Sequence, residues 1–150
     1  MTEKLILLVE DNDDDAELCV RALQKNNLAN EIVRARDGQE ALNFLHDESI
    51  AAERFGETYP ELILLDLKLP KVDGLEVLNA IRNHARTKHL PVVVLTSSDL
   101  EDDIVACYDG GANGFVRKPI NYLEFVEAVG NLGLFWLVIN RTPQPGLSGP

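Results

Sequence analysis

Cysteine, tryptophan and methionine are scarce in this chain, which has two, one and one of them among its 150 residues. Cys19 and Cys107 lie far apart and form no C-x-x-C pair, so a disulfide framework or a thiol redox site is not expected. No apolar run approaches the roughly 20 residues that cross a membrane, and no charged-then-apolar leader opens the chain. These absences predict a cytoplasmic protein that does not enter the membrane.

Positive charge is scarce as well. Lysine and arginine total 14 against 25 aspartates and glutamates, which gives a formal net charge of −11. Because proteins bind nucleic acid through basic faces that neutralise its phosphates, direct contact with nucleic acid is not expected. The hydrophobic fraction of 45% is enough for the core of one domain.

Short apolar runs alternate with longer segments of helical spacing. The runs predict strands at Leu5–Val9, Ile32–Val33, Leu62–Leu65, Val92–Leu95 and Gly114–Val116. The helical spacing of apolar residues predicts helices over residues 14–26, 38–52, 74–84, 99–109 and 121–138. Strands that are apolar on both faces are typical of a parallel sheet covered by helices on both sides. We therefore predict an α/β fold with a doubly wound, five-stranded parallel sheet.

Polar side chains stand where the predicted strands end. Glu10 and Asp11 follow the first strand, Asp66 follows the third, Thr96 the fourth and Lys118 the fifth. In open α/β sheets, ligands bind outside the carboxyl ends of the strands. We therefore expect three carboxylates, a hydroxyl and an ammonium to converge at one edge of the sheet.

This combination of side chains favours phosphoryl chemistry. Three carboxylates in one crevice cannot all stay ionised unless a proton or a cation neutralises them. Oxygen ligands without histidine or cysteine favour a hard ion such as Mg²⁺, or Mn²⁺ in its place. A carboxylate can act as the nucleophile that forms an acyl phosphate, while Lys118 and Thr96 stabilise charge on the transferring group. No G-x-x-x-x-G-K-[ST] loop is present, so a nucleoside triphosphate is not the expected phosphate source.

Four motifs carry a resemblance to a known family: VEDN, LLDLKLP with DG two residues later, LTSS and FVRKP, in this order over roughly residues 4–130. Together they resemble the receiver domain of two-component response regulators, which implies a flavodoxin-like (βα)5 fold. The resemblance implies that Asp66 is the phosphoacceptor. It also implies that Glu10, Asp11 and Asp66 hold Mg²⁺ together with the backbone carbonyl of Lys68.

The same resemblance assigns roles to the residues of the last two motifs. Thr96 is similar to the switch hydroxyl and Phe115 to the switch aromatic of receivers. Lys118 is similar to the lysine that pairs with the phosphoryl group, and Pro119 would follow a cis peptide bond. Such a protein catalyses only its own phosphorylation and slow dephosphorylation.

The acidic run that follows Asp11 has a different explanation. Asn12 and Asp13 are expected as helix caps, because short polar side chains satisfy the free N–H groups of a first turn. Asp14 and Asp15 are expected as first-turn acids, which the helix dipole favours. We therefore expect no metal-binding role for residues 13–15.

The end of the chain, GLFWLVIN, is more apolar than a solvent-facing helix. At 3.6 residues per turn its apolar residues cannot all pack on one face. We predict a receiver domain over residues 1–139 with an extended last helix and a flexible tail over 140–150. We also predict a homodimer through that helix, with these candidates at the interface: Leu134, Phe135, Trp136 and Val138.

The chain resembles the small response regulators that are paired with phytochromes. It shares with them the EDN motif, a long second helix region over Gln39–Glu57, the apolar C-terminus and the lack of an output domain. The expected partner is therefore a sensor histidine kinase, of the light-regulated phytochrome type. One alternative is a phosphatase-like hydrolase, which would need an acidic residue where Lys68 stands. Another is a phosphate-independent adaptor with a degenerate receiver fold.

Overall fold

Five parallel strands form a single sheet in the computed structural model, which describes residues 5–25, 31–47, 49–50, 53 and 59–142. The strands are β1 Leu5–Val9, β2 Glu31–Ala35, β3 Leu62–Leu65, β4 Val92–Thr96 and β5 Gly114–Arg117. Their order across the sheet is β2-β1-β3-β4-β5. The chain changes direction across the sheet between β1 and β3, and a switch point of this kind is where open α/β sheets bind ligands.

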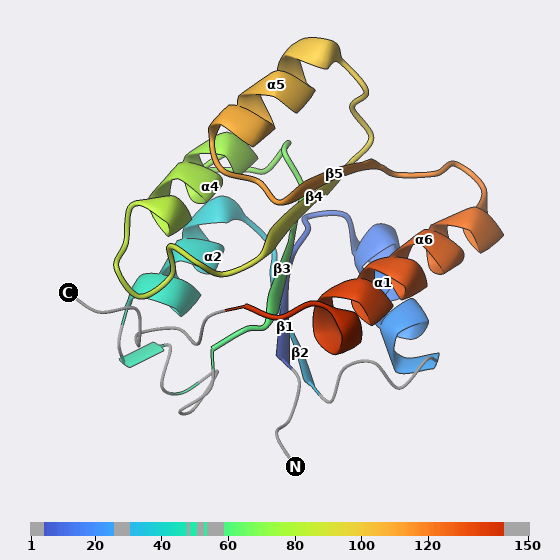
Figure 1. The fold of residues 1–150 in the computed structure, drawn as a ribbon, viewed down its shortest axis with the longest axis horizontal. Coiled ribbons are helices and arrows are strands. Elements are labelled where there is room, and N and C mark those ends of the chain that lie inside the picture. The colour runs from blue at the N-terminus through green and yellow to red at the C-terminus, as the bar shows by residue number, and fades with distance from the viewer. Residues whose placement is uncertain (1–4, 26–30, 48, 51–52, 54–58, 143–150) are drawn as a thin grey trace.

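Helices cover both faces of the sheet (Figure 1). α1 (Asp13–Lys25) and α6 (Tyr122–Leu134) lie on one face. The other face carries α2 (Gly38–His46), α4 (Gly74–Arg82) and α5 (Glu101–Asp109). The predicted α/β fold with a doubly wound, five-stranded parallel sheet is therefore confirmed.

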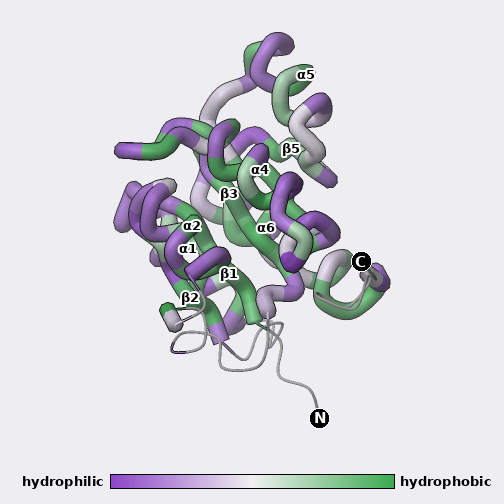
Figure 2. Tube along the Cα trace, turned by 90° about the vertical axis from the view of Figure 1, so that its left-hand side faces the viewer, coloured by the Kyte–Doolittle hydropathy of each residue, from purple (hydrophilic) through white to green (hydrophobic). Residues whose placement is uncertain are grey.

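Each face of the sheet buries its own apolar cluster, because successive residues of a strand point to opposite sides. On β1, Ile6 and Leu8 join the cluster beneath α1 and α6, whereas Leu7 and Val9 join the cluster beneath α2 and α4. Figure 2 shows the green strands enclosed by helices that carry purple, hydrophilic residues. β1, β3 and β4 are buried along their whole length. The residues that directly follow these strands are therefore held in place by a well-packed core.

α4 ends and α5 begins two residues inside their predicted ranges, and α2 and α6 differ more from the prediction. α2 ends at His46 and does not run unbroken to residue 52, because Asp47 adopts an extended conformation and its carboxylate accepts hydrogen bonds from Ser49 and Ile50 N–H. Residues 49–50 are helical again after this break, and residues 51–52 lie outside the described residues. α6 ends at Leu134 and continues as η1, a π-helical segment over Phe135–Ile139.

The last helical stretch is strongly apolar in composition. Residues Tyr122–Ile139 have the length and mean hydropathy, 1.5, of a membrane span. In this fold, however, Phe125, Val129 and Leu137 of that stretch are buried in the cluster that α1 shares with α6. Part of its apolar character therefore serves the core of the domain itself.

Candidate functional site

Three carboxylates meet at the switch point, where β1 and β3 end. Glu10 and Asp11 follow β1, Asp66 follows β3, and one oxygen of each lies within 4.8 Å of the others. Glu10 and Asp66 are buried, at 2% and 8% exposed, whereas Asp11 is exposed. Three carboxylate oxygens fit a hard divalent cation such as Mg²⁺ or Mn²⁺. Such an ion would neutralise the carboxylates and stabilise charge on a phosphoryl oxygen when bound.

Lys118 brings a cation to this acidic cluster from the end of β5. Its Nζ donates to Glu10 Oε1 at 2.5 Å, Asp15 Oδ2 at 2.9 Å and Asp66 Oδ2 at 3.1 Å. An ammonium has three N–H groups, so each is matched to a different carboxylate. Burial of this side chain lowers the pKa of Lys118, but the hydrogen bonds to Asp15 and Glu10 and the charge of Asp66 outweigh it and raise that pKa. Lys118 therefore stays charged.

The surroundings of Glu10 favour its protonated form. Burial raises the pKa of Glu10 to about 7, and the nearby charge of Asp66 acts in the same direction. The hydrogen bond from Lys118 acts against this rise. Around neutral pH, therefore, a protonated and an ionised Glu10 are close in free energy.

The turn that presents Glu10 is held by an arginine from the neighbouring strand. Arg34, on β2, donates to the Glu10 carbonyl through Nε at 3.1 Å and Nη2 at 2.9 Å. Its Nη1 donates to Asp13 Oδ1 at 2.8 Å, and this contact lowers the pKa of Asp13. Asn12 Oδ1 accepts from Asp15 N–H at 2.9 Å, so the predicted cap at Asn12 is confirmed. Asp13 instead pairs with the arginine.

The remaining strand ends supply a hydroxyl and an aromatic ring. Thr96, the last residue of β4, is fully buried, and its carbonyl accepts from Lys118 N–H at 2.6 Å. Phe115 lies on β5 opposite Val94 and packs, partly buried, against the cluster beneath α2 and α4. Their roles in switching stay predictions.

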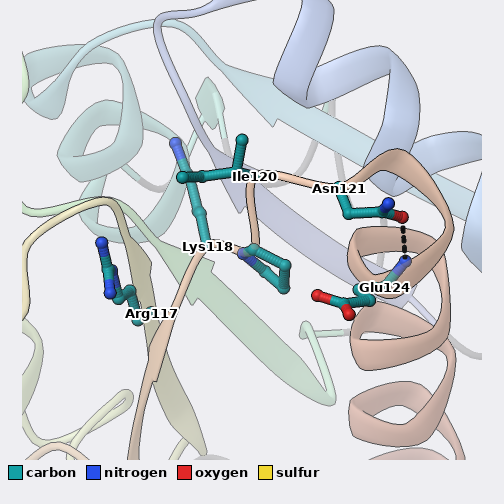
Figure 3. Close-up of a pocket in the computed structure, with 6 residues that line it drawn as sticks. Arg117, Lys118, Ile120, Asn121 and Glu124 are labelled. Carbon is teal, nitrogen blue, oxygen red and sulfur yellow. Dashed lines mark hydrogen bonds between the residues drawn. The ribbon is translucent and has the colours of Figure 1, made fainter.

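Lys68 and Pro119 border the site. Lys68 is exposed, and its N–H lies 3.4 Å from Asp66 Oδ1, while the role of its carbonyl as a ligand stays a prediction. The described residues contain no cis peptide bond, so the predicted cis bond before Pro119 is wrong. The trans form is the preferred one at proline, and here it already places Lys118 in the acidic cluster. Figure 3 shows Asn121 capping α6 by accepting a hydrogen bond from Glu124 N–H.

The predicted dimer residues differ in their surroundings. Leu134, Phe135 and Val138 are 46%, 46% and 62% exposed. Trp136 is partly buried against the cluster that α1 shares with α6, and its ring meets Phe135 edge-on at 5.1 Å. Figure 2 shows this stretch as green tube close to the C-terminus. The exposed part of the candidate interface thus consists of three side chains.

One residue of the site is not among those predicted from the sequence. Asp15 is expected only as a first-turn acid, whereas its carboxylate contacts Lys118 in the structure. A signal was present, because Asp15, Cys19 and Ala22 follow helical spacing, and Cys19 and Ala22 are fully buried. Asp15 therefore begins the face of α1 that turns toward the sheet.

A doubly wound sheet with clustered carboxylates and a lysine at its carboxyl edge has the fold and the site of a receiver domain. The family model for the response regulator receiver domain matches residues 6–130. The chain therefore belongs to the response regulator receiver domain family.

Individual proteins of similar sequence and structure agree with this assignment. The chain is 40% identical over 141 residues to the probable methanogenesis regulatory protein FilR2 of Methanothrix harundinacea, covering 94% of this chain and 88% of that protein. It is 40% identical over 134 residues to response regulator Rcp1 of Synechocystis, covering 89% of each. The crystal structure of the phosphorylated cyanobacterial phytochrome response regulator RcpA superposes with a TM-score of 0.87 at 40% identity, covering 95% of this chain and all (100%) of that one. The Mn²⁺-bound structure of Rcp1 gives 0.83 at 39% identity, covering 93% and 99%.

Proposed function

We propose that this protein is a cytoplasmic response regulator whose Asp66 accepts a phosphoryl group from the phosphohistidine of a phytochrome-type sensor histidine kinase, with Mg²⁺ required. The observation that carries the proposal is the contact of Lys118 Nζ with Asp66 Oδ2 at 3.1 Å beside two further carboxylates. Among the relatives, RcpA is a phytochrome response regulator that was crystallised phosphorylated. Rcp1 was crystallised with Mn²⁺.

The proposed chemistry uses the side chains that meet at this edge of the sheet. An Asp66 carboxylate oxygen attacks the phosphorus, the O–P bond forms as the P–N bond of the phosphohistidine breaks, and the imidazole leaves with the electron pair. Lys118 stabilises the negative charge on the phosphoryl oxygens, and Thr96 donates a hydrogen bond to one of them. Glu10, Asp11, Asp66 and the Lys68 carbonyl would hold the cation. Water later hydrolyses the acyl phosphate slowly.

The output of the switch is proposed for the face formed by α5, β5 and α6. Thr96 moves toward the phosphoryl group and Phe115 turns inward, which changes the packing of this face. The face already presents apolar side chains to solvent, since Tyr108 and Tyr122 are each 51% exposed. Partner docking there would then depend on phosphorylation.

Homodimerisation is proposed through the end of the last helix. In a receiver domain over residues 1–139, Leu134, Phe135 and Val138 expose apolar area that a second copy would cover. The expected result is a dimer by light scattering for the parent and a monomer for Phe135→Lys with Val138→Lys. Ile120→Lys, at a residue 96% exposed elsewhere on the surface, is the control. A monomeric parent would contradict the dimer.

The test of phosphorylation is the intact mass of the protein after incubation with phosphoramidate, with and without Mg²⁺. One added phosphoryl group that requires both Mg²⁺ and Asp66 is expected, so Asp66→Asn should gain none. No addition to the parent under any condition would overturn the proposal and favour the phosphate-independent adaptor. Transfer from a phosphorylated phytochrome-type kinase, compared with an unrelated histidine kinase, tests the partner.

A further inference from the structure

We infer that Asp15 is a positioning residue, which holds the Lys118 ammonium beside Asp66 and so sets the rate at which Asp66 accepts a phosphoryl group. The inference rests on the proposed function of Asp66. Its basis is the contact between Asp15 Oδ2 and Lys118 Nζ at 2.9 Å, which joins the first turn of α1 to the end of β5.

Asp15 differs from the other two acceptors of Lys118 in what else it can bind. Glu10 and Asp66 belong to the group of three carboxylates whose oxygens lie close enough to share one cation, and Asp15 does not. A cation held by Glu10 and Asp66 would share their charge and so would weaken their hold on Lys118. Asp15 then becomes the main anchor of the ammonium, and the two other N–H groups are available to phosphoryl oxygens.

The geometry also shows that Asp15 does not draw Lys118 away from the phosphoacceptor. The ammonium touches Asp15 at 2.9 Å and Asp66 at 3.1 Å at the same time. Lysine has a long flexible stem, so an unanchored ammonium spends less time at one position. The lysine side chain is 9% exposed and that of Asp15 30%, which leaves the contact partly screened by solvent. We therefore expect its loss to slow phosphorylation by about five- to tenfold.

The neighbouring Asp14 offers a matched control. It lies in the same first turn, is exposed, and has no hydrogen bond or ion pair among the described contacts. Asp14→Asn and Asp15→Asn remove the same charge from adjacent positions and keep the same side-chain shape. A difference between the two variants therefore reports the contact with Lys118 and not the net charge of the turn.

The rate of phosphorylation by phosphoramidate at saturating Mg²⁺ is measured by intact mass for four proteins and the parent. Asp15→Asn should be about five- to tenfold slower than the parent, and Asp14→Asn should stay within about twofold. In a Lys118→Met background, adding Asp15→Asn should cause no further loss, because the group that Asp15 positions is gone. Equal rates for Asp15→Asn and the parent, or an undiminished effect of Asp15→Asn beside Lys118→Met, would overturn the inference.

A second readout follows the lysine itself. In protein labelled with ¹⁵N-lysine, the Lys118 ammonium signal is assigned by its disappearance in Lys118→Met. With Mg²⁺ present, the parent and Asp14→Asn should keep a protected ammonium signal, and Asp15→Asn should lose it. A signal that survives in Asp15→Asn would overturn the inference. If the parent accepts no phosphoryl group, the proposed function fails, and this signal still decides whether Asp15 holds Lys118.

Discussion

Replacing Gly74 by alanine should destabilise the protein and displace the phosphoacceptor. Gly74 is the first residue of α4 and lies directly against the backbone that follows β3. A Cβ there would stand 2.6 Å from Leu67 Cα and 2.9 Å from Leu67 O, and closer still to the carbonyl oxygen of Asp66. These are backbone atoms, which cannot move aside as the end of a flexible side chain would. The start of α4 and the residues around Asp66 must therefore separate.

The magnitude follows from three contributions to the free energy of unfolding. Overpacking typically costs about 1–3 kcal/mol. The hydrogen bond from Gly74 N–H to Leu67 O, 2.8 Å long, would be weakened by the separation, at a further cost of about 1 kcal/mol. Against these, alanine restricts the unfolded chain more than glycine does, a gain of about 0.4–1 kcal/mol. We expect a net loss of about 1–3.5 kcal/mol.

The assay is urea unfolding followed by circular dichroism, together with the phosphorylation rate. Gly114→Ala is the matched control, because a Cβ at Gly114 would meet Val93 at an ordinary 3.6 Å, so the same substitution should be nearly neutral there. Phosphorylation of Gly74→Ala should be slower than that of the parent even where the variant is fully folded. A loss below about 0.5 kcal/mol for Gly74→Ala, or an equal loss for Gly114→Ala, would refute the reasoning.

Three further predictions concern the site and its supports. The pKa of Glu10 lies at about 7 in the folded protein against 4.5 ordinarily, so the stability it contributes without metal is lost as pH rises through about 7. Because a cation displaces that proton, the rise in Tm on adding Mg²⁺ should be larger at pH 8 than at pH 6, and Glu10→Gln should remove the difference. Arg82 donates hydrogen bonds to the carbonyls of Gly111 and Leu90 at 2.8 and 2.7 Å. Arg82→Met should therefore lower the free energy of unfolding in urea by about 2 kcal/mol. A decrease no larger than that for replacing an exposed arginine would contradict this prediction. Asn121→Ala should cost about 1 kcal/mol through the lost cap of α6, and Asn121→Ser should restore most of it.

The order of the elements and the residues at the strand ends could be predicted from the sequence. Buried strands of a parallel sheet are short runs of residues that are apolar on both faces. This pattern is present in the five residues of Leu5–Val9 and the four residues of Leu62–Leu65. The parallel order then places the carboxyl ends of the strands at one edge. The meeting of Glu10, Asp11 and Asp66 follows from that rule alone.

Other features depend on contacts that no local pattern contains. The helix predicted over 38–52 is interrupted at Asp47, whose carboxylate accepts hydrogen bonds from the N–H groups of Ser49 and Ile50, and residues 49–50 are helical again. A cis bond before Pro119 was predicted by resemblance, whereas the structure reaches the same site with a trans bond. Neither feature can be read from residue type and short-range spacing.

The sequence by itself determined the alternation of strands and helices and the chemistry available at their ends, because both depend on residue type and short-range spacing. Only the tertiary structure decided which groups touch. Asp15 meets Lys118 across 103 residues of chain, and Arg34 on β2 holds the carbonyl of Glu10. These contacts depend on how α1 and the strands pack against one another, and hydrogen bonds form only when that packing brings donor and acceptor within about 3 Å.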